Sequence, residues 1–196
     1  MGCGKSSVGR ELSKLLCCLF VDLDSAVEEK AGRKIPEIFA SDGEAVFRQM
    51  ERDALTDILE KQCTSLVPAT YAGVLALGGG TVMTPECAEM VHEKTLCIYL
   101  RASVDTLMRN LSSRAESRPM LRTPSQTSSR GADSGMSPRG AERRGDLLNR
   151  IEELMALRSA TYESTAHIII DTDGKSVEDI AGEIASAYSN LTVDLN

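Results

Sequence analysis

Short apolar runs alternate along the chain with longer segments of helical periodicity. Apolar residues recur every three or four positions between Ser7 and Leu16, which predicts an amphipathic helix. The run Leu19-Phe20-Val21 follows, and its length is typical of a buried strand. The same criteria predict further strands over 73–77, 95–100 and 167–170, and helices over about 25–30, 35–40, 44–60, 103–112, 146–162 and 176–189, with one more opening at Thr84-Pro85.

This alternation of strands and helices predicts an α/β fold, with a parallel sheet flanked by helices on both faces. Chemically distinctive residues follow three of the four expected strands: Asp22 and Asp24, the run Gly78–Gly80, and Asp171. In open parallel sheets, ligands bind beyond the carboxyl ends of the strands. We therefore expect a binding site at this edge of the sheet.

The segment 114–144 differs from the rest of the chain, because it is rich in Ser, Gly, Pro and Arg and nearly devoid of apolar residues. Such a composition favours a loop. We expect a mobile lid over about 114–145, within a single domain that spans 1–196.

Composition narrows the classes of function. The chain has 196 residues, of which 42% are hydrophobic, a fraction that supports one compact core. Its net charge of −7 and its lack of Trp argue against binding to nucleic acid or to an anionic membrane. No apolar run reaches the roughly 18 residues of a membrane span. The six cysteines form no CxxC pair, so we expect reduced thiols and a cytoplasmic location.

The N-terminal residues match the second half of the phosphate-loop pattern G-x-x-x-x-G-K-[ST]. The matching run is Gly2-Cys3-Gly4-Lys5-Ser6. In this pattern backbone N–H groups surround the phosphates, the Lys reaches the terminal phosphates, and the hydroxyl binds Mg²⁺. The predicted helix starts at Ser6 or Ser7, so its positive end would face the phosphates. The alternative is a solvated N-terminal tail.

Several blocks in order resemble shikimate kinase, and they cover nearly the whole chain. They are Phe20-Val21-Asp22-Leu23-Asp24, Ile38-Phe39, Gly43-Glu44-x-x-Phe47-Arg48-x-x-Glu51, Leu77-Gly78-Gly79-Gly80, Arg118-Pro119-Met120-Leu121 and Arg158-x-x-x-Tyr162. The resemblance implies a P-loop kinase fold, with a sheet of about five strands in the order 2-3-1-4-5. It implies transfer of the γ-phosphate of ATP to the 3-hydroxyl of shikimate, with Mg²⁺, on the route to chorismate and the aromatic amino acids.

The same resemblance assigns roles to individual residues. The residues implied to bind ATP are Gly2, Cys3, Gly4, Lys5, Ser6, Ser7, Arg114 and Arg118, and those implied to hold Mg²⁺ are Ser6 and Asp22. The residues implied to bind shikimate are Asp24, Arg48, Gly78, Gly79, Gly80 and Arg158. Of all these, Lys5, Asp24 and Arg118 are the implied catalytic residues.

The residue types suit these roles. A planar guanidinium binds a carboxylate through two parallel hydrogen bonds, which fits Arg48 and Arg158 to a substrate carboxylate. Glu51 lies three residues after Arg48 on the same helix face, where it can orient that side chain. The structural alternatives are a solvated ion pair on a helix for Arg48 and Glu51, and a plain turn for Asp22 and Asp24.

Two other functions remain open from the residues alone. One is a related small-molecule kinase such as a gluconate kinase, and the other is a non-catalytic P-loop module that binds nucleotide. The resemblance also places the first strand and the first phosphate-loop glycine before Met1. We expect that the chain as given lacks them through a misassigned start, folds poorly and is nearly inactive, and that the protein works as a monomer.

Overall fold

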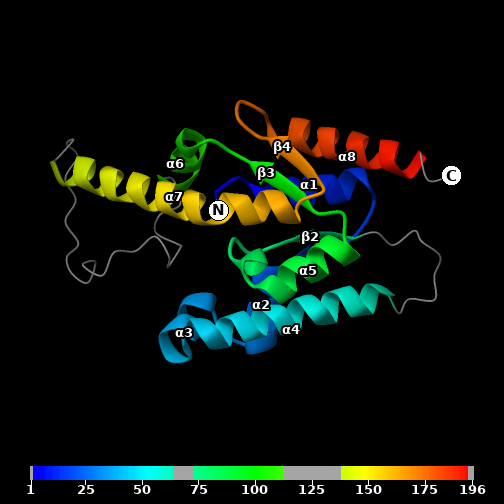
Figure 1. Ribbon diagram of the computed structural model, residues 1–196, viewed down its shortest axis with the longest axis horizontal. Coiled ribbons are helices and arrows are strands. Elements are labelled where there is room, and N and C mark those ends of the chain that lie inside the picture. Colours follow the sequence, from blue (N-terminus) through cyan, green and yellow to red (C-terminus); the bar gives the residue numbers. More distant parts are fainter. Residues whose placement is uncertain (1, 64–72, 113–137, 194–196) are drawn as a thin grey trace.

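The computed structural model describes residues 2–63, 73–112 and 138–193 (Figure 1). The N-terminal half contains α1 (Lys5–Leu15), β1 (Phe20–Asp22), α2 (Leu23–Ala31), α3 (Ile35–Ser41) and α4 (Gly43–Cys63). The remainder contains β2 (Val74–Ala76), the 3-10 helix η1 (Thr81–Met83), α5 (Pro85–Lys94), β3 (Ile98–Arg101), α6 (Val104–Ser112), α7 (Pro138–Thr165), β4 (Ile168–Asp171) and α8 (Val177–Val193).

The strands form two parallel pairs, β1 with β2 and β3 with β4. Phe20 pairs with Val74 in the first, and Ile98 pairs with Ile168 in the second. Within the described residues, no strand pairing joins β2 to β3, although the two pairs lie beside one another (Figure 1). The pairs correspond to strands 2-3 and 4-5 of the expected order, on the two sides of its strand 1.

Helices cover both faces of the strands. On one face α2, α4 and α5 pack around β2, through core residues that include Leu23, Leu55 and Val91. On the other face α1 and α8 pack against β3 and β4, through Val8 and Ile184 among others. A third cluster joins α6 to α7 near the phosphate loop. The layered arrangement leaves the carboxyl ends of the strands as the edge where a ligand can reach the backbone.

Local capping defines several helix starts. At α8 the backbone N–H of Asp179 donates to Ser176 Oγ (3.1 Å), and the Ser176 N–H donates back to Asp179 Oδ2 (3.2 Å). Ser103 caps α6 by accepting a hydrogen bond from the Thr106 N–H. Thr84 occupies the N-cap position of α5, but its side chain forms no capping hydrogen bond. The sequence therefore locates all three helix starts, and of these three only the start of α5 lacks a side-chain capping bond.

The structure corrects two predicted boundaries. Helix α7 begins at Pro138, whereas the sequence predicted a loop as far as residue 144 and a helix from about Asp146. Proline is compatible with the first turn of a helix, and the run Ala141–Arg144 consists of strong helix formers. Strand β3 begins at Ile98 rather than at Thr95, because Thr95 ends α5 and its Oγ donates to the Val91 carbonyl (2.6 Å).

Part of the predicted chemistry lies outside the described residues. Arg114 and Arg118 belong to the range 113–137, which the structure does not describe.

Within the described ranges, none of the helices combines the length and the apolar character that a membrane span requires.

Two helical glycines provide a test of the packing. A Cβ on Gly9 of α1 would lie 2.6 Å from Phe20 Cε2, whereas a Cβ on Gly182 of α8 would meet nothing within 4 Å. Alanine favours a helix over glycine by about 1 kcal/mol, and crowding a packed position costs about 1–3 kcal/mol. We therefore predict that Gly182→Ala raises the free energy of unfolding measured in urea. The free energy of unfolding of Gly9→Ala should be about 1–3 kcal/mol lower than that of Gly182→Ala. Equal gains for both variants would contradict the packing of α1 on β1.

Candidate active site

The phosphate-loop fragment turns directly into α1. Gly4 is the N-cap residue and adopts a left-handed conformation with φ of +84°. Its carbonyl accepts hydrogen bonds from the backbone N–H groups of Ser7 and Val8, each at 2.9 Å. A positive φ at this point suits glycine, because a Cβ makes the conformation strained. The first N–H groups of an eleven-residue helix are thus presented at the end of the loop.

The segment before Gly4 is held by α6. Gly2 also has a positive φ, and a Cβ on it would lie 2.9 Å from Leu111 Cγ. Asn110 Nδ2 donates to the Gly2 carbonyl at 2.7 Å. Lys5 Nζ lies 3.8 Å from Cys3 Sγ. Burial raises the pKa of the Cys3 thiol, but the Lys5 ammonium and nearby backbone N–H groups outweigh it, so the pKa lies below its usual value.

Ser6 and Asp22 meet where α1 begins and β1 ends. The Ser6 hydroxyl donates to Asp22 Oδ2 at 2.6 Å, and Asp22 Oδ1 accepts a longer hydrogen bond from the Ser25 N–H at the start of α2. Mg²⁺ in nucleotide sites is held by one or two protein oxygens together with phosphate oxygens. This pair provides such oxygens, so the residues fit the ion that the sequence predicted. Among the described residues, no cluster of three or more His, Cys, Asp or Glu could hold a metal ion by itself.

The loop Gly78–Gly80 follows β2 and is crowded by acidic and basic side chains. A Cβ on Gly78 would lie 2.7 Å from both Asp24 Oδ1 and Glu51 Oε1. A Cβ on Gly80 would lie 2.5 Å from Arg48 Nη2. The absence of side chains in this loop is therefore what allows Asp24 and Arg48 to approach its backbone.

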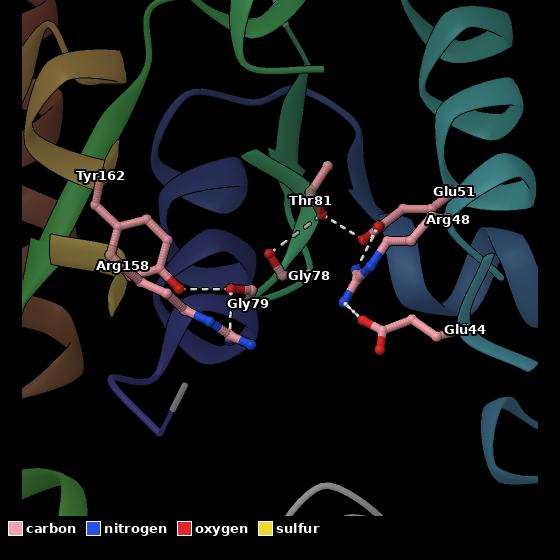
Figure 2. Close-up of polar contacts among 8 residues, drawn as sticks. All are labelled: Glu44, Arg48, Glu51, Gly78, Gly79, Thr81, Arg158 and Tyr162. Carbon is pink, nitrogen blue, oxygen red and sulfur yellow. Dashed lines mark hydrogen bonds and ion pairs between the residues drawn. The ribbon is translucent and has the colours of Figure 1, made fainter. Parts of the chain in front are cut away.

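Glu51 is buried between α4 and this loop, with a relative exposure of 1%. One carboxylate oxygen accepts from the Thr81 hydroxyl, and the other accepts from Arg48 Nη1 at 2.7 Å (Figure 2). Arg48 Nη2 also contacts the exposed carboxylate of Glu44 at 3.1 Å. Burial lowers the pKa of Arg48, but the hydrogen bonds and charges of Glu51 and Glu44 outweigh it and raise the pKa above its usual value. Arg48 is therefore a fixed, permanently charged cation.

Arg158 and Tyr162 approach the same loop from α7. Arg158 Nη1 donates to the Gly79 carbonyl at 3.0 Å, and the Tyr162 hydroxyl donates to the same oxygen. Figure 2 shows the guanidinium groups of Arg158 and Arg48 on opposite sides of the loop, both directed toward the lower part of the view. Because the carbonyl and the following N–H point opposite ways in a peptide plane, the Gly80 N–H points away from Tyr162.

Most of the predicted residues are thus brought to one edge of the sheet. The residues grouped there are Gly2, Cys3, Gly4, Lys5, Ser6, Ser7, Asp22, Asp24, Arg48, Gly78, Gly79, Gly80 and Arg158. Sequence reasoning missed the contacts that Thr81, Glu44 and Asn110 make with Glu51, Arg48 and Gly2, and of these three residues only Glu44 lies in a block that carried the resemblance.

Comparison with known proteins identifies the family. The sequence profile described as shikimate kinase matches residues 1–189. A shikimate kinase of Thioalkalivibrio sulfidiphilus is 35% identical over 188 residues, which are 96% of this chain and 83% of the relative. One from Thermus thermophilus is 33% identical over 184 residues, which are 94% of this chain and 83% of the relative. The chain belongs to the shikimate kinase family.

Solved structures agree with this assignment. The shikimate kinase of Acinetobacter baumannii, determined in complex with shikimate, superposes with a TM-score of 0.78 at 27% identity, covering 97% of this chain and 89% of that one. The shikimate kinase of Bacteroides thetaiotaomicron superposes with a TM-score of 0.73 at 22% identity, covering 96% of this chain and 94% of that one. At this identity the similarity supports the fold alone. The predicted shikimate kinase family, its enzyme class and the P-loop kinase fold are confirmed. Shikimate kinases use ATP as the phosphate donor.

The two carboxylates that contact Arg48 provide a matched pair of variants. Glu51→Gln removes the buried charge that fixes Arg48, and we predict a loss of about 1–3 kcal/mol in the free energy of unfolding. Glu44→Gln removes a partner that is 61% exposed, and we predict a loss of less than about 1 kcal/mol. Urea denaturation of both variants measures the difference. Equal effects would show that the buried carboxylate does not fix Arg48.

Proposed function

We propose that this chain transfers the γ-phosphate of ATP to the 3-hydroxyl of shikimate, with Mg²⁺. The observation that carries the proposal is the grouping of Asp24, Arg48 and Arg158 around one glycine loop, at the same sheet edge as the phosphate loop. A cation on each side of the loop and a carboxylate against it suit a small hydroxylated acid. The proposal also rests on the family to which the chain belongs.

Arg48 and Arg158 are proposed to bind the shikimate carboxylate. Both side chains present N–H donors of a planar guanidinium, the geometry that binds carboxylates through paired hydrogen bonds. Arg48 is held by Glu51 at 2.7 Å, so little side-chain entropy is lost when a ligand binds to it. Arg158 is held by the Gly79 carbonyl, an uncharged acceptor that a substrate carboxylate can replace.

Lys5 and the N-terminus of α1 are proposed to bind the phosphates of ATP, together with the backbone of Gly2, Cys3 and Gly4. Ser6 and Asp22 are proposed to hold Mg²⁺, which neutralises phosphate charge when bound. Phosphoryl transfer depends mainly on alignment and charge neutralisation, and a lysine at a helix N-terminus supplies both. Arg114 and Arg118 keep their predicted roles, although they lie outside the described residues.

Asp24 is proposed to orient the attacking 3-hydroxyl of shikimate and to accept its proton. Its Oδ1 atom approaches Gly78, so the carboxylate lies against the glycine loop, two residues after Asp22, the predicted Mg²⁺ ligand that ends β1. The backbone N–H groups of Gly79 and Gly80 are proposed to contact the substrate. We further propose that the protein acts as a monomer in the cytoplasm.

Arg48→Ala and Arg158→Ala test the carboxylate site. Loss of one charge-assisted pair costs about 1.5–3 kcal/mol, so we predict that each variant raises the KM for shikimate by roughly 10- to 100-fold and leaves the KM for ATP within about twofold. The rate of ADP release, measured while shikimate or ATP is varied, gives the two KM values. If turnover is slow, calorimetry gives the dissociation constants of shikimate and ATP for the same comparison.

Arg52→Ala is the matched control, because Arg52 lies one turn from Arg48 on α4 and donates to Gln49 instead. This variant should leave both constants unchanged. If the Arg48 and Arg158 variants raise the KM for ATP as much as the KM for shikimate, the result would count against the carboxylate site. Phosphorylation of gluconate in preference to shikimate would contradict the proposed substrate.

A further inference from the structure

The Gly79 carbonyl accepts hydrogen bonds from two donors at once. Arg158 Nη1 donates to it at 3.0 Å, and the Tyr162 hydroxyl donates to the same oxygen (Figure 2). The two donors lie one turn apart on α7, so their side chains leave the same face of the helix. A carbonyl oxygen has two lone pairs and can hold both hydrogen bonds together. It therefore keeps a partner when one of the two donors leaves.

Tyr162 is the donor that is fixed by packing. Its ring lies 5.3 Å from the ring of Tyr99 on β3, and it packs against the core cluster that contains Val82 and Val91. A tyrosine side chain has only two rotatable torsions, so a packed ring leaves its hydroxyl little freedom to move. The hydroxyl is thus held in place independently of any ligand.

Arg158 is the donor that can leave. Within the described part of the chain it takes part in no ion pair, and the Gly79 carbonyl is the acceptor to which it donates. Arg48, by contrast, is held by the carboxylates of Glu51 and Glu44. Hydrogen bonds from a guanidinium to a carboxylate are about twice as strong as those between neutral groups. A substrate carboxylate can therefore draw Arg158 away from Gly79.

The orientation of the Gly79 carbonyl matters because it sets the direction of the next N–H group. The carbonyl and the Gly80 N–H belong to one planar peptide group and point opposite ways. Gly80 is buried, and among the described residues no protein acceptor takes up its N–H. Holding the Gly79 carbonyl thus holds the Gly80 N–H, one of the groups proposed to contact the substrate.

We propose that Tyr162 is a positioning residue, which holds the Gly79 carbonyl while Arg158 turns from that carbonyl to the substrate carboxylate. The exchange moves one guanidinium and transfers no proton. Without the hydroxyl, Arg158 would be the carbonyl's remaining donor, and binding the substrate would leave the carbonyl without a partner. The inference rests on the proposed function, because shikimate supplies the carboxylate that takes up Arg158.

Tyr162→Phe tests this role, because it removes the hydroxyl and keeps the ring. We expect the KM for shikimate to rise by roughly 5- to 20-fold, the worth of one hydrogen bond lost on binding. The KM for ATP should stay within about twofold, because the Gly79 carbonyl lies at the proposed carboxylate site. ADP release gives both constants, and calorimetry gives the dissociation constants if turnover is slow.

The same substitution in an Arg158→Ala background separates donor exchange from simple support of the loop. No donor leaves the carbonyl in this background when the substrate binds. Removal of the Tyr162 hydroxyl should then raise the KM for shikimate by less than about twofold. A hydroxyl that only stabilises the loop would raise the KM by the same factor in both backgrounds.

Tyr99→Phe is the matched control. It makes the same chemical change on the ring that packs against Tyr162, and Tyr99 does not donate to the Gly79 carbonyl. This variant should leave the KM for shikimate and the KM for ATP unchanged.

The outcomes separate the positioning role from the reaction. If Tyr162→Phe binds shikimate as tightly as the wild type, or if it loses the same factor with and without Arg158, the role of Tyr162 is refuted while the proposed function stands. A wild-type chain that binds no shikimate would contradict the proposed function, and the exchange of Arg158 with it. A loss that depends on Arg158 and is absent from Tyr99→Phe is the result expected.

Discussion

The carboxylate of Glu51 is the constraint on which the candidate active site depends. A buried charge is costly unless it is paired and hydrogen-bonded, and here the Thr81 hydroxyl and the Arg48 guanidinium supply both requirements. Through these contacts one side chain of α4 fixes the direction of Arg48 and holds the turn that follows Gly78–Gly80. The glycines complete the constraint, because a side chain at Gly78 would occupy the position of the carboxylates.

The loop is held on its opposite side by α7. Arg158 and Tyr162 both donate to the Gly79 carbonyl, and these residues lie about eighty positions later in the sequence. The contacts of Arg48 on one side and of Arg158 on the other place a guanidinium on each side of a loop that has no side chains. A ligand carboxylate therefore meets preformed donors, and the rigid loop limits the conformational entropy lost on binding.

Local patterns were sufficient to predict much of this arrangement. The helical stripe after Ser7, the short run before Asp22 and the glycine run after Leu77 are local signals, and α1, β1 and the loop after β2 lie where those signals placed them. The sequence also indicated the contact between Arg48 and Glu51, because residues three apart are neighbours on a helix.

The features that were not predicted depend on tertiary contacts. Thr81 reaches Glu51 across thirty positions, and Asn110 reaches the Gly2 carbonyl across more than one hundred. A threonine after three glycines carries no pattern that distinguishes a buried hydrogen bond from a turn. The early start of α7 was missed for another reason, because Ser, Gly and Pro nearby masked the helix formers in Ala141–Arg144.

The separation of the two strand pairs connects the architecture to the chemistry. Cys3 and Lys5 of the phosphate loop and Gly78 and Gly79 of the glycine loop line the same cavity between β2 and β3, so the strand edges and the site share a boundary. The hydrogen bonds to the Gly79 carbonyl come from α7, and the ion pair that holds Arg48 lies within α4, so neither depends on a strand pairing between β2 and β3.

The most direct measurement of the central claim is a titration of the isotopically labelled chain with shikimate, followed by the backbone amide shifts of Gly78, Gly79 and Gly80 and the Nε–H signal of Arg48. The account predicts saturable changes that are largest at these positions, because the ligand carboxylate and hydroxyls would lie against this loop. Saturable changes confined to other parts of the chain, with the loop amides unmoved, would contradict it.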